Sequence, residues 1–211
     1  PKLVGNQRNI VVSDQSGKSN IISRLKTIGI EVDNEDPKIK KILNEVKDRE
    51  FIGYSYDGAD ASFELLARRI IGEIPTYLTI SEYDVSVKKN NKGKIISIAK
   101  AHILVDGNEV VCEGEGNGPV NALDNAIRKN VDKVGKYSKY LKDLKLVDYK
   151  VRILNTGTEA ITRVSIESTD SKGKNWFTIG VSTNIIEASF KALIDSLDYK
   201  LFKEQAPASK K

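Results

Sequence analysis

A glycine-rich turn holds the first residues whose types and spacing could do chemistry. Gly114, Gly116 and Gly118 follow a strand-like run, and Pro119 opens a helix-like one, so we expect the chain to turn sharply from strand to helix. Amides in the first turn of a helix have no partner inside the helix and attract anions. An equivalent turn, Ser182-Thr183-Asn184, comes later in the chain. Both turns are candidates for holding a carboxylate.

Four apolar residues could form a wall beside such a carboxylate: Leu146, Tyr149, Ile153 and Val181. Apolar walls with a few polar groups are typical of small-molecule sites, and this combination suits a branched amino acid. The same four residues could instead be ordinary core residues. The sequence leaves both interpretations open.

Other motifs indicate no catalysis. Gly17-Lys18-Ser19 is similar to the end of a phosphate-binding loop, but Val12 stands where that loop requires its first glycine. The glycines around Gly116 have the wrong third spacing for a dinucleotide fingerprint. One histidine, His102, and one cysteine, Cys112, are too few for a zinc site, and the thiol has no second histidine as a base. We therefore predict no catalytic residue, cofactor or metal in this chain.

The second half of the chain contains two similar segments, at about 76–140 and 144–202. Each has three strand-like runs followed by one amphipathic helix. The run that begins at Glu82 aligns with the run at Asp148, and the run at Gly114 aligns with the run at Gly180. A single βββα unit cannot cover both faces of its own sheet, so two copies are expected to pack together. A ligand could bind between them.

The first part of the chain has a helical pattern instead. Pro37 stands at a tolerated position in a first helical turn, and Ile39, Ile42, Leu43 and Val46 recur at helical spacing. We expect similar helices before and after this one, and a short strand at 9–12. The predicted fold class is α+β: a helical linker region at 1–73, then a tandem βββα regulatory domain at 74–211, with a disordered tail at 204–211.

Composition sets outer limits on function. The chain has 211 residues, 39% of them hydrophobic, and no run approaches the roughly 20 apolar residues of a membrane span. A start at Pro1, without Met, favours a cut end. A single cysteine fits a reducing cytoplasm. The net charge of +5 leaves a nucleic-acid-binding α/β module as an alternative, but acidic residues are interspersed with the lysines, so we expect neither a nucleic-acid nor a membrane partner.

Four ordered motifs carry a family resemblance that spans essentially the whole chain. They resemble the C-terminal part of the 2-isopropylmalate synthase and citramalate synthase family, and the run from Tyr56 to Leu66 is most similar to the citramalate synthase branch. The motifs are Asp14-Gln15-Ser16-Gly17-Lys18-Ser19-Asn20, the run at 53–66, Gly116-Asn117-Gly118-Pro119, and Trp176-Phe177-Thr178-Ile179-Gly180-Val181-Ser182 with its continuation at 184–189.

The resemblance implies a regulatory role. In that family a (β/α)8 barrel binds a divalent metal and performs the acyl-CoA condensation, which in the citramalate synthase branch joins acetyl-CoA to pyruvate for isoleucine biosynthesis. A pair of βββα units binds the feedback amino acid at a homodimer interface. No barrel is found here, so we expect no turnover by this chain alone. The loop at 13–20 would lie near the barrel's catalytic site. The implied effector is isoleucine, or leucine in the isopropylmalate branch. A ligand-free dimerisation segment is a further alternative. The implied effector residues are Asn117, Gly118, Pro119, Val120, Leu146, Tyr149, Ile153, Ala160, Thr162, Val181 and Ser182.

Overall fold

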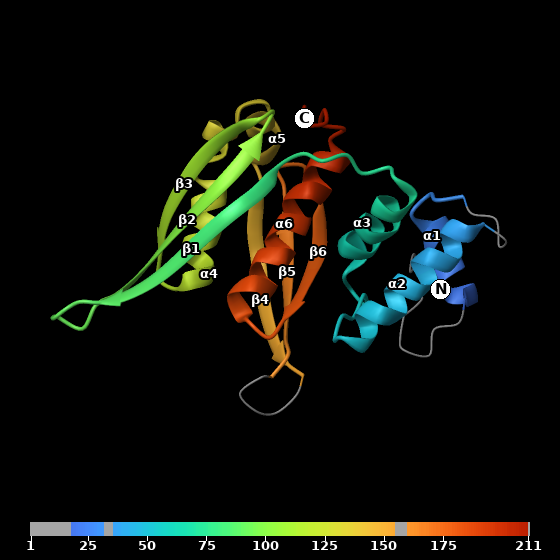
Figure 1. Ribbon diagram of the computed structural model, residues 1–211, viewed down its shortest axis with the longest axis horizontal. Coiled ribbons are helices and arrows are strands. Elements are labelled where there is room, and N and C mark those ends of the chain that lie inside the picture. The colour runs from blue at the N-terminus through green and yellow to red at the C-terminus, as the bar shows by residue number, and fades with distance from the viewer. Residues whose placement is uncertain (1–17, 32–35, 155–159, 211) are drawn as a thin grey trace.

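The computed structural model describes residues 18–31, 36–154 and 160–210. The strand expected at 9–12 and all but the end of the loop at 13–20 lie outside these residues. Figure 1 shows the three-stranded sheet β1–β3 at one end, α6 with the sheet β4–β6 in the middle, and α1, α2 and α3 at the other end. The predicted α+β class and the tandem βββα arrangement are confirmed.

The helical region contains α1 (Lys18–Thr27), α2 (Pro37–Phe51) and α3 (Asp60–Ile71). Asp36 caps α2 by accepting a hydrogen bond from the Lys38 amide at 2.8 Å. Gly72 ends α3 in the left-handed conformation that glycine adopts without strain. The three helices share a core with buried Phe63 and Tyr56, and Ile179 of β6 enters this core from the neighbouring domain.

Each repeat forms an antiparallel sheet with its strands in chain order. The first contains β1 (Thr79–Lys89), β2 (Ile95–Val105) and β3 (Asn108–Gly116), followed by α4 (Pro119–Arg128), the 3-10 segment η2 (Val131–Tyr137) and the short α5 (Ser138–Leu141). The second contains β4 (Lys145–Ile153), β5 (Thr162–Thr169) and β6 (Asn175–Ser182), followed by α6 (Ile185–Lys203).

The two repeats agree in detail. The first strand of each has a register shift at the same aligned position, at Ser81 in β1 and at Val147 in β4. The third strand of each passes under its helix at a glycine. A Cβ atom at Gly114 would lie 2.6 Å from the Ala122 carbonyl oxygen, and one at Gly180 would lie 2.9 Å from the Ala192 amide nitrogen. Glycine is therefore required at both positions so that the helix can approach the sheet.

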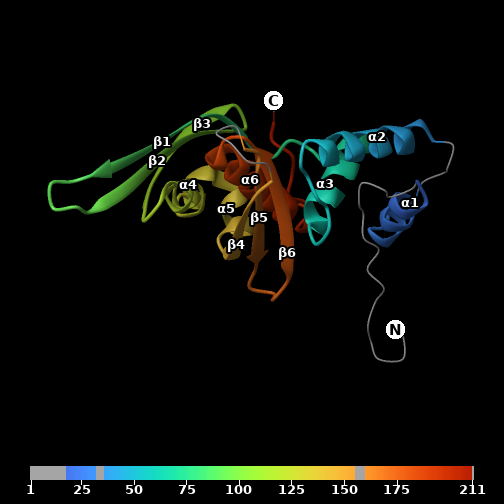
Figure 2. The same ribbon diagram turned by 90° about the horizontal axis from the view of Figure 1, so that it is seen from below.

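Helix α6 contributes to the cores of both repeats. Its residues Leu197 and Leu201 belong to the core around Ala101 and Leu123 of the first unit, while Ala192 packs with Ile166 of the second. The Phe190 ring also stacks on Tyr83 of β1, with ring centroids 4.4 Å apart. In Figure 2, α6 lies between the first sheet and strands β5 and β6. The two units therefore form one packed domain, as expected for repeats that cannot bury their faces alone.

The tail after α6, for which the sequence predicts disorder, makes contacts with the first repeat. Glu204–Lys210 is described, and Ala206 is buried. The Ser209 amide donates to the Thr76 carbonyl at 2.8 Å, and the Tyr137 hydroxyl donates to the Pro207 carbonyl at 2.9 Å. These contacts place the tail beside the first sheet and η2, a position that its polar composition does not reveal.

Candidate functional site

The first glycine turn has the geometry needed to receive an anion. Gly118 is the N-cap of α4 in an extended conformation, Pro119 occupies the first helical turn, and no side chain caps the helix. The Asn121 side-chain oxygen instead accepts from the Asn117 amide, which precedes the helix, at 3.3 Å. The first amides of α4, including that of Val120, thus lack a capping side chain, and a carboxylate could take that role.

The second turn satisfies its own amides. The Asn184 side-chain oxygen accepts from the amides of Ile186 at 2.8 Å and Glu187 at 3.4 Å. Ser182 donates its hydroxyl to the Glu187 carboxylate at 2.8 Å, and hydrogen bonds from Lys191 and Ser182 hold the pKa of that carboxyl below its usual range. The structure therefore offers the first turn, rather than the second, to an incoming carboxylate.

Three of the predicted residues form one row across the second sheet. Ile153 of β4 pairs with Thr162 of β5, which pairs with Ser182 of β6. Thr162 is buried, whereas Ile153 is 71% exposed. Ile185, at the start of α6, is also exposed, so this end of the sheet presents apolar side chains to solvent. Ala160 is partly buried and lies two residues before Thr162.

Tyr149 faces α6 on the same side of the sheet. It pairs with buried Ile166, and its hydroxyl lies 2.8 Å from the Ser189 hydroxyl, which donates to the Ile185 carbonyl at 2.6 Å. Burial raises the pKa of Tyr149, and the hydrogen bond with Ser189 opposes the shift. The phenol is therefore neutral at pH 7 and tied to the first turns of α6.

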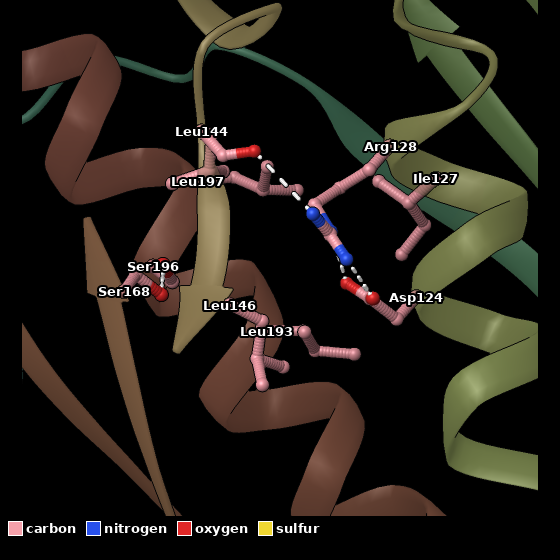
Figure 3. A pocket seen from close by; sticks show the side chains of 9 residues that line it. All are labelled: Asp124, Ile127, Arg128, Leu144, Leu146, Ser168, Leu193, Ser196 and Leu197. Carbon is pink, nitrogen blue, oxygen red and sulfur yellow. Dashed lines mark hydrogen bonds and ion pairs between the residues drawn. The ribbon is translucent and has the colours of Figure 1, made fainter. Parts of the chain in front are cut away.

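Leu146 lines a small cavity between the two repeats (Figure 3). The ion pair of Arg128 with Asp124 lies along one side, and Arg128 also donates to the Leu144 carbonyl at 3.3 Å. The cavity measures about 10 Å³, which is room for about one water molecule. It does not hold an amino-acid side chain in this conformation. The wall also includes Ile127, Ser168, Leu193, Ser196 and Leu197.

The eleven predicted residues thus fall into separate places. Ile153 and Leu146 are at opposite ends of β4, about 20 Å apart at about 3.3 Å per residue. Val181 lies on the other face of the sheet from Ser182, and its side chain would be 3.4 Å from a Cβ atom at Gly53 in the helical region. Figure 1 shows that α4 and α6 both begin at the end of the domain where β4 ends. The first glycine turn and the Ile153 row are therefore at the same end.

Comparison with known proteins identifies the family. The LeuA allosteric (dimerisation) domain matches residues 57–201. The chain belongs to this family.

Relatives of the LeuA-type chain are named as synthases. The chain described here is 45% identical over 208 residues to an (R)-citramalate synthase of Aquifex aeolicus, and the alignment covers 97% of this chain and 39% of the relative. It is 44% identical over 215 residues to the enzyme of Geobacter sulfurreducens, with coverage of 100% and 40%. A probable 2-isopropylmalate synthase of Methanopyrus kandleri is 28% identical over 195 residues, with coverage of 92% and 37%. The chain spans about two fifths of the length of these relatives.

Two further findings concern metal ligands and membrane spans. Within 18–31, 36–154 and 160–210, no group of three or more His, Cys, Asp or Glu side chains is placed to hold a metal ion. In the same residues, no helix combines the length and apolar character that a membrane crossing requires.

Sequence reasoning missed Ser189, the hydroxyl partner of Tyr149. The sequence does contain a signal for this residue. Ser189 is a polar residue beside Phe190 and one turn before Leu193, on the apolar side of α6, and a buried hydroxyl needs a hydrogen-bond partner. Its partner could not be named without knowing which strand faces that turn.

Proposed function

We propose that this chain is the regulatory region of a citramalate synthase, and that it binds a branched-chain amino acid, with isoleucine as the first choice, to inhibit its parent enzyme. The observation that carries the proposal is the match of 57–201 to an allosteric domain, together with relatives named (R)-citramalate synthase over nearly the whole chain. Leucine, as effector of a 2-isopropylmalate synthase, is the alternative within the family.

The proposed site uses the uncapped turn and the row at the same end of the domain. The effector carboxylate binds the first amides of α4 near Gly118 and Val120. The aliphatic side chain packs on Ile153 and the adjoining apolar positions of the second sheet. The 71% exposure of Ile153 supports a site that another surface completes. A second copy of the chain, as the name of the dimerisation domain suggests, would supply that surface.

Inhibition requires two conformations with different affinities for the effector, because a ligand shifts an equilibrium only by that difference. Helix α6, which packs in the cores of both repeats, is the element that such a change would move. The condensation, its divalent metal and the acyl-CoA belong to the barrel of the parent enzyme, outside this chain.

Calorimetric titration of the chain with isoleucine, leucine and valine tests the proposal. Isoleucine is expected to bind most tightly, while a preference for leucine would indicate the isopropylmalate branch. D-isoleucine is the matched control, because it has the same composition and charge. Absence of binding heat from all three L-amino acids, in a sample that is folded and dimeric, would remove the effector assignment.

A further inference from the structure

The buried hydroxyl of Ser62 joins three elements of the structure. Ser62 lies in the first turn of α3 and is 3% exposed. Its hydroxyl donates to the Asp195 carboxylate of α6 at 2.8 Å and accepts from the Ile179 amide of β6 at 3.0 Å. One side chain of the helical region thus contacts both the helix and the outer strand of the second repeat.

The contact with β6 has a structural reason. β6 is the edge strand of its sheet, so one row of its backbone groups has no strand partner. The Ile179 amide belongs to that row and is buried, so loss of the Ser62 hydroxyl would leave it without a hydrogen bond. The Ile179 side chain lies in the core of the helical region. Helix α3 therefore covers this edge and is held in register with it.

Further contacts tie α3 to α6 along its length. Arg69 donates to Asp195 and to Asp198, each at 2.7 Å. The buried Glu64 carboxylate accepts hydrogen bonds from the Lys203 ammonium group at 2.9 Å and from the Tyr199 hydroxyl at 3.2 Å.

On its other side, α3 is tied to α1. Arg68 donates to the Ile28 carbonyl at 2.7 Å, and Asp60 forms an ion pair with Arg24. Helix α3 thus lies between α6 and α1 with polar contacts to both, and a shift of α6 cannot leave α3 in place without breaking the hydrogen bonds of Ser62, Glu64 and Arg69.

We propose that Ser62 is the positioning residue that couples the second βββα unit to the helical region, so that α3 follows any movement of α6 and β6. The inference deepens the proposed function and rests on it in one respect, which is that the effector amino acid is the ligand that moves α6. Asp195 lies on the same helix as Ser189, which bonds Tyr149 beside the predicted effector row. A rigid helix carries a displacement at one end to the other, and the Ser62 hydroxyl passes it to α3.

Native-state hydrogen exchange without ligand tests the coupling directly. Ser62→Ala is expected to speed exchange of the amides in α1, α2 and α3 by about 5- to 150-fold, the usual effect of leaving a buried amide such as that of Ile179 without its partner, while α6 keeps its wild-type rates. Ser62→Thr keeps the hydroxyl and is expected to restore slow exchange. Ser81→Ala removes an exposed hydroxyl from β1 and is the matched control. A purely structural role would speed exchange equally in α3 and α6. That result, or no change in either, overturns the inference.

The second arm adds isoleucine. In the wild type, isoleucine is expected to slow exchange in the second repeat and also in α1–α3. In Ser62→Ala the binding heat is expected to remain, while α1–α3 are slowed less than in the wild type, because only the contacts of Arg69 and Glu64 then join α3 to α6. Equal slowing of α1–α3 in the variant overturns the coupling. No binding heat with the wild type overturns the proposed effector instead, and the ligand-free exchange then decides the role of Ser62 alone.

Discussion

Gly180 of β6 and Ala188 of α6 are in direct backbone contact, and a Cβ atom at Gly180 would collide with the Ala188 carbonyl oxygen. The aligned residue of the first repeat, Gly114, has the same relation to Ala122. In both repeats the distance between helix and sheet is therefore set by the missing side chain of one glycine. Backbone atoms cannot move aside as a flexible side chain can, so any larger residue must displace the helix.

Gly180→Ala is expected to lower the free energy of unfolding by about 1 to 3 kcal/mol, the usual cost of overpacking. Urea unfolding of the folded domain measures this change. Gly118→Ala is the matched control, because a Cβ atom there has no heavy atom within 4 Å and its φ of −155° is open to any residue. Equal stability of the Gly180 and Gly118 variants would show that helix and sheet are not held at this spacing.

The repeat itself could be predicted from the sequence because the same strand, glycine and helix positions recur and each has a local cause. Strand alternation also separates Val181 from Ser182, since neighbouring strand residues point to opposite faces. Val181 and Ser182 therefore lie on opposite faces of the second sheet. The bulge at Val147, by contrast, lets Leu146 and Tyr149 face the same side, and only the register shows it.

The contacts between distant segments could not be predicted. Val181 contacts the helical region because that region covers one face of the second sheet. Ser62 bonds β6 because α3 covers the edge of that strand. Neither arrangement leaves a periodic signal in the sequence. The ordered tail is of the same kind, because Pro207 is fixed by a tyrosine hydroxyl that lies far away in the chain.

Truncation after Gln205 is expected to destabilise the domain although it removes only a short polar tail. The truncation removes buried Ala206 and so exposes the residues that it covers. It also removes the Ala208 carbonyl, which accepts a hydrogen bond from the Lys136 ammonium group at 2.7 Å. We expect a loss of about 1 to 3 kcal/mol, from hydrogen bonds worth about 1 kcal/mol each, measured by urea unfolding. Tyr137→Phe, which removes only the bond to Pro207, should show a smaller loss. A truncated chain as stable as the full one would contradict the ordered tail.

Lys200 is expected to be essential for stability. It is 3% exposed and lies 2.7 Å from Asp170, whose side chain is also buried. Burial acts to lower the pKa of Lys200, but the hydrogen bond with Asp170 and the charge of Asp143 outweigh it and raise the pKa, so the pair stays ionised. Lys200→Met leaves Asp170 buried without its partner and should cost about 3 to 5 kcal/mol.

Lys172 provides the control for this pair. Lys172 pairs with Glu204, which also contacts Lys200, at 2.7 Å, but the Lys172 side chain is 55% exposed. Lys172→Met should therefore change the free energy of unfolding by less than about 1 kcal/mol. Similar losses for Lys172→Met and Lys200→Met would show that burial is not what makes the Lys200 pair important.

Tyr149→Ala is expected to weaken isoleucine binding by about tenfold or more, as loss of about 1.4 kcal/mol implies, while the dimer remains folded. The phenol fixes β4 against the start of α6 through Ser189. Tyr149→Phe removes only that hydrogen bond and should weaken binding less. Tyr140→Ala, in α5, is the control for loss of a partly buried ring. Calorimetry with unchanged affinity for Tyr149→Ala would remove Tyr149 from the site.

Asp198 should make stability depend on pH in an unusual direction. Burial raises the pKa of this carboxyl to about 6, against the opposing effect of its ion pair with Arg69. In the unfolded chain the pKa is about 3.9. Between these two values the folded state binds more protons than the unfolded state, so the contribution of Asp198 to stability falls as pH rises from about 4 to 6.

The comparison of wild type with Asp198→Asn isolates this contribution, because the amide does not titrate. The wild type should lose up to about 3 kcal/mol relative to the variant between pH 4 and 7, at about 1.4 kcal/mol per pKa unit, as measured by urea unfolding at each pH. Asp148→Asn is the control of opposite sign, since its hydrogen bond with Lys150 lowers the pKa of Asp148. A wild type that gains stability relative to Asp198→Asn over this range would mean that Arg69, rather than burial, determines the charge of Asp198.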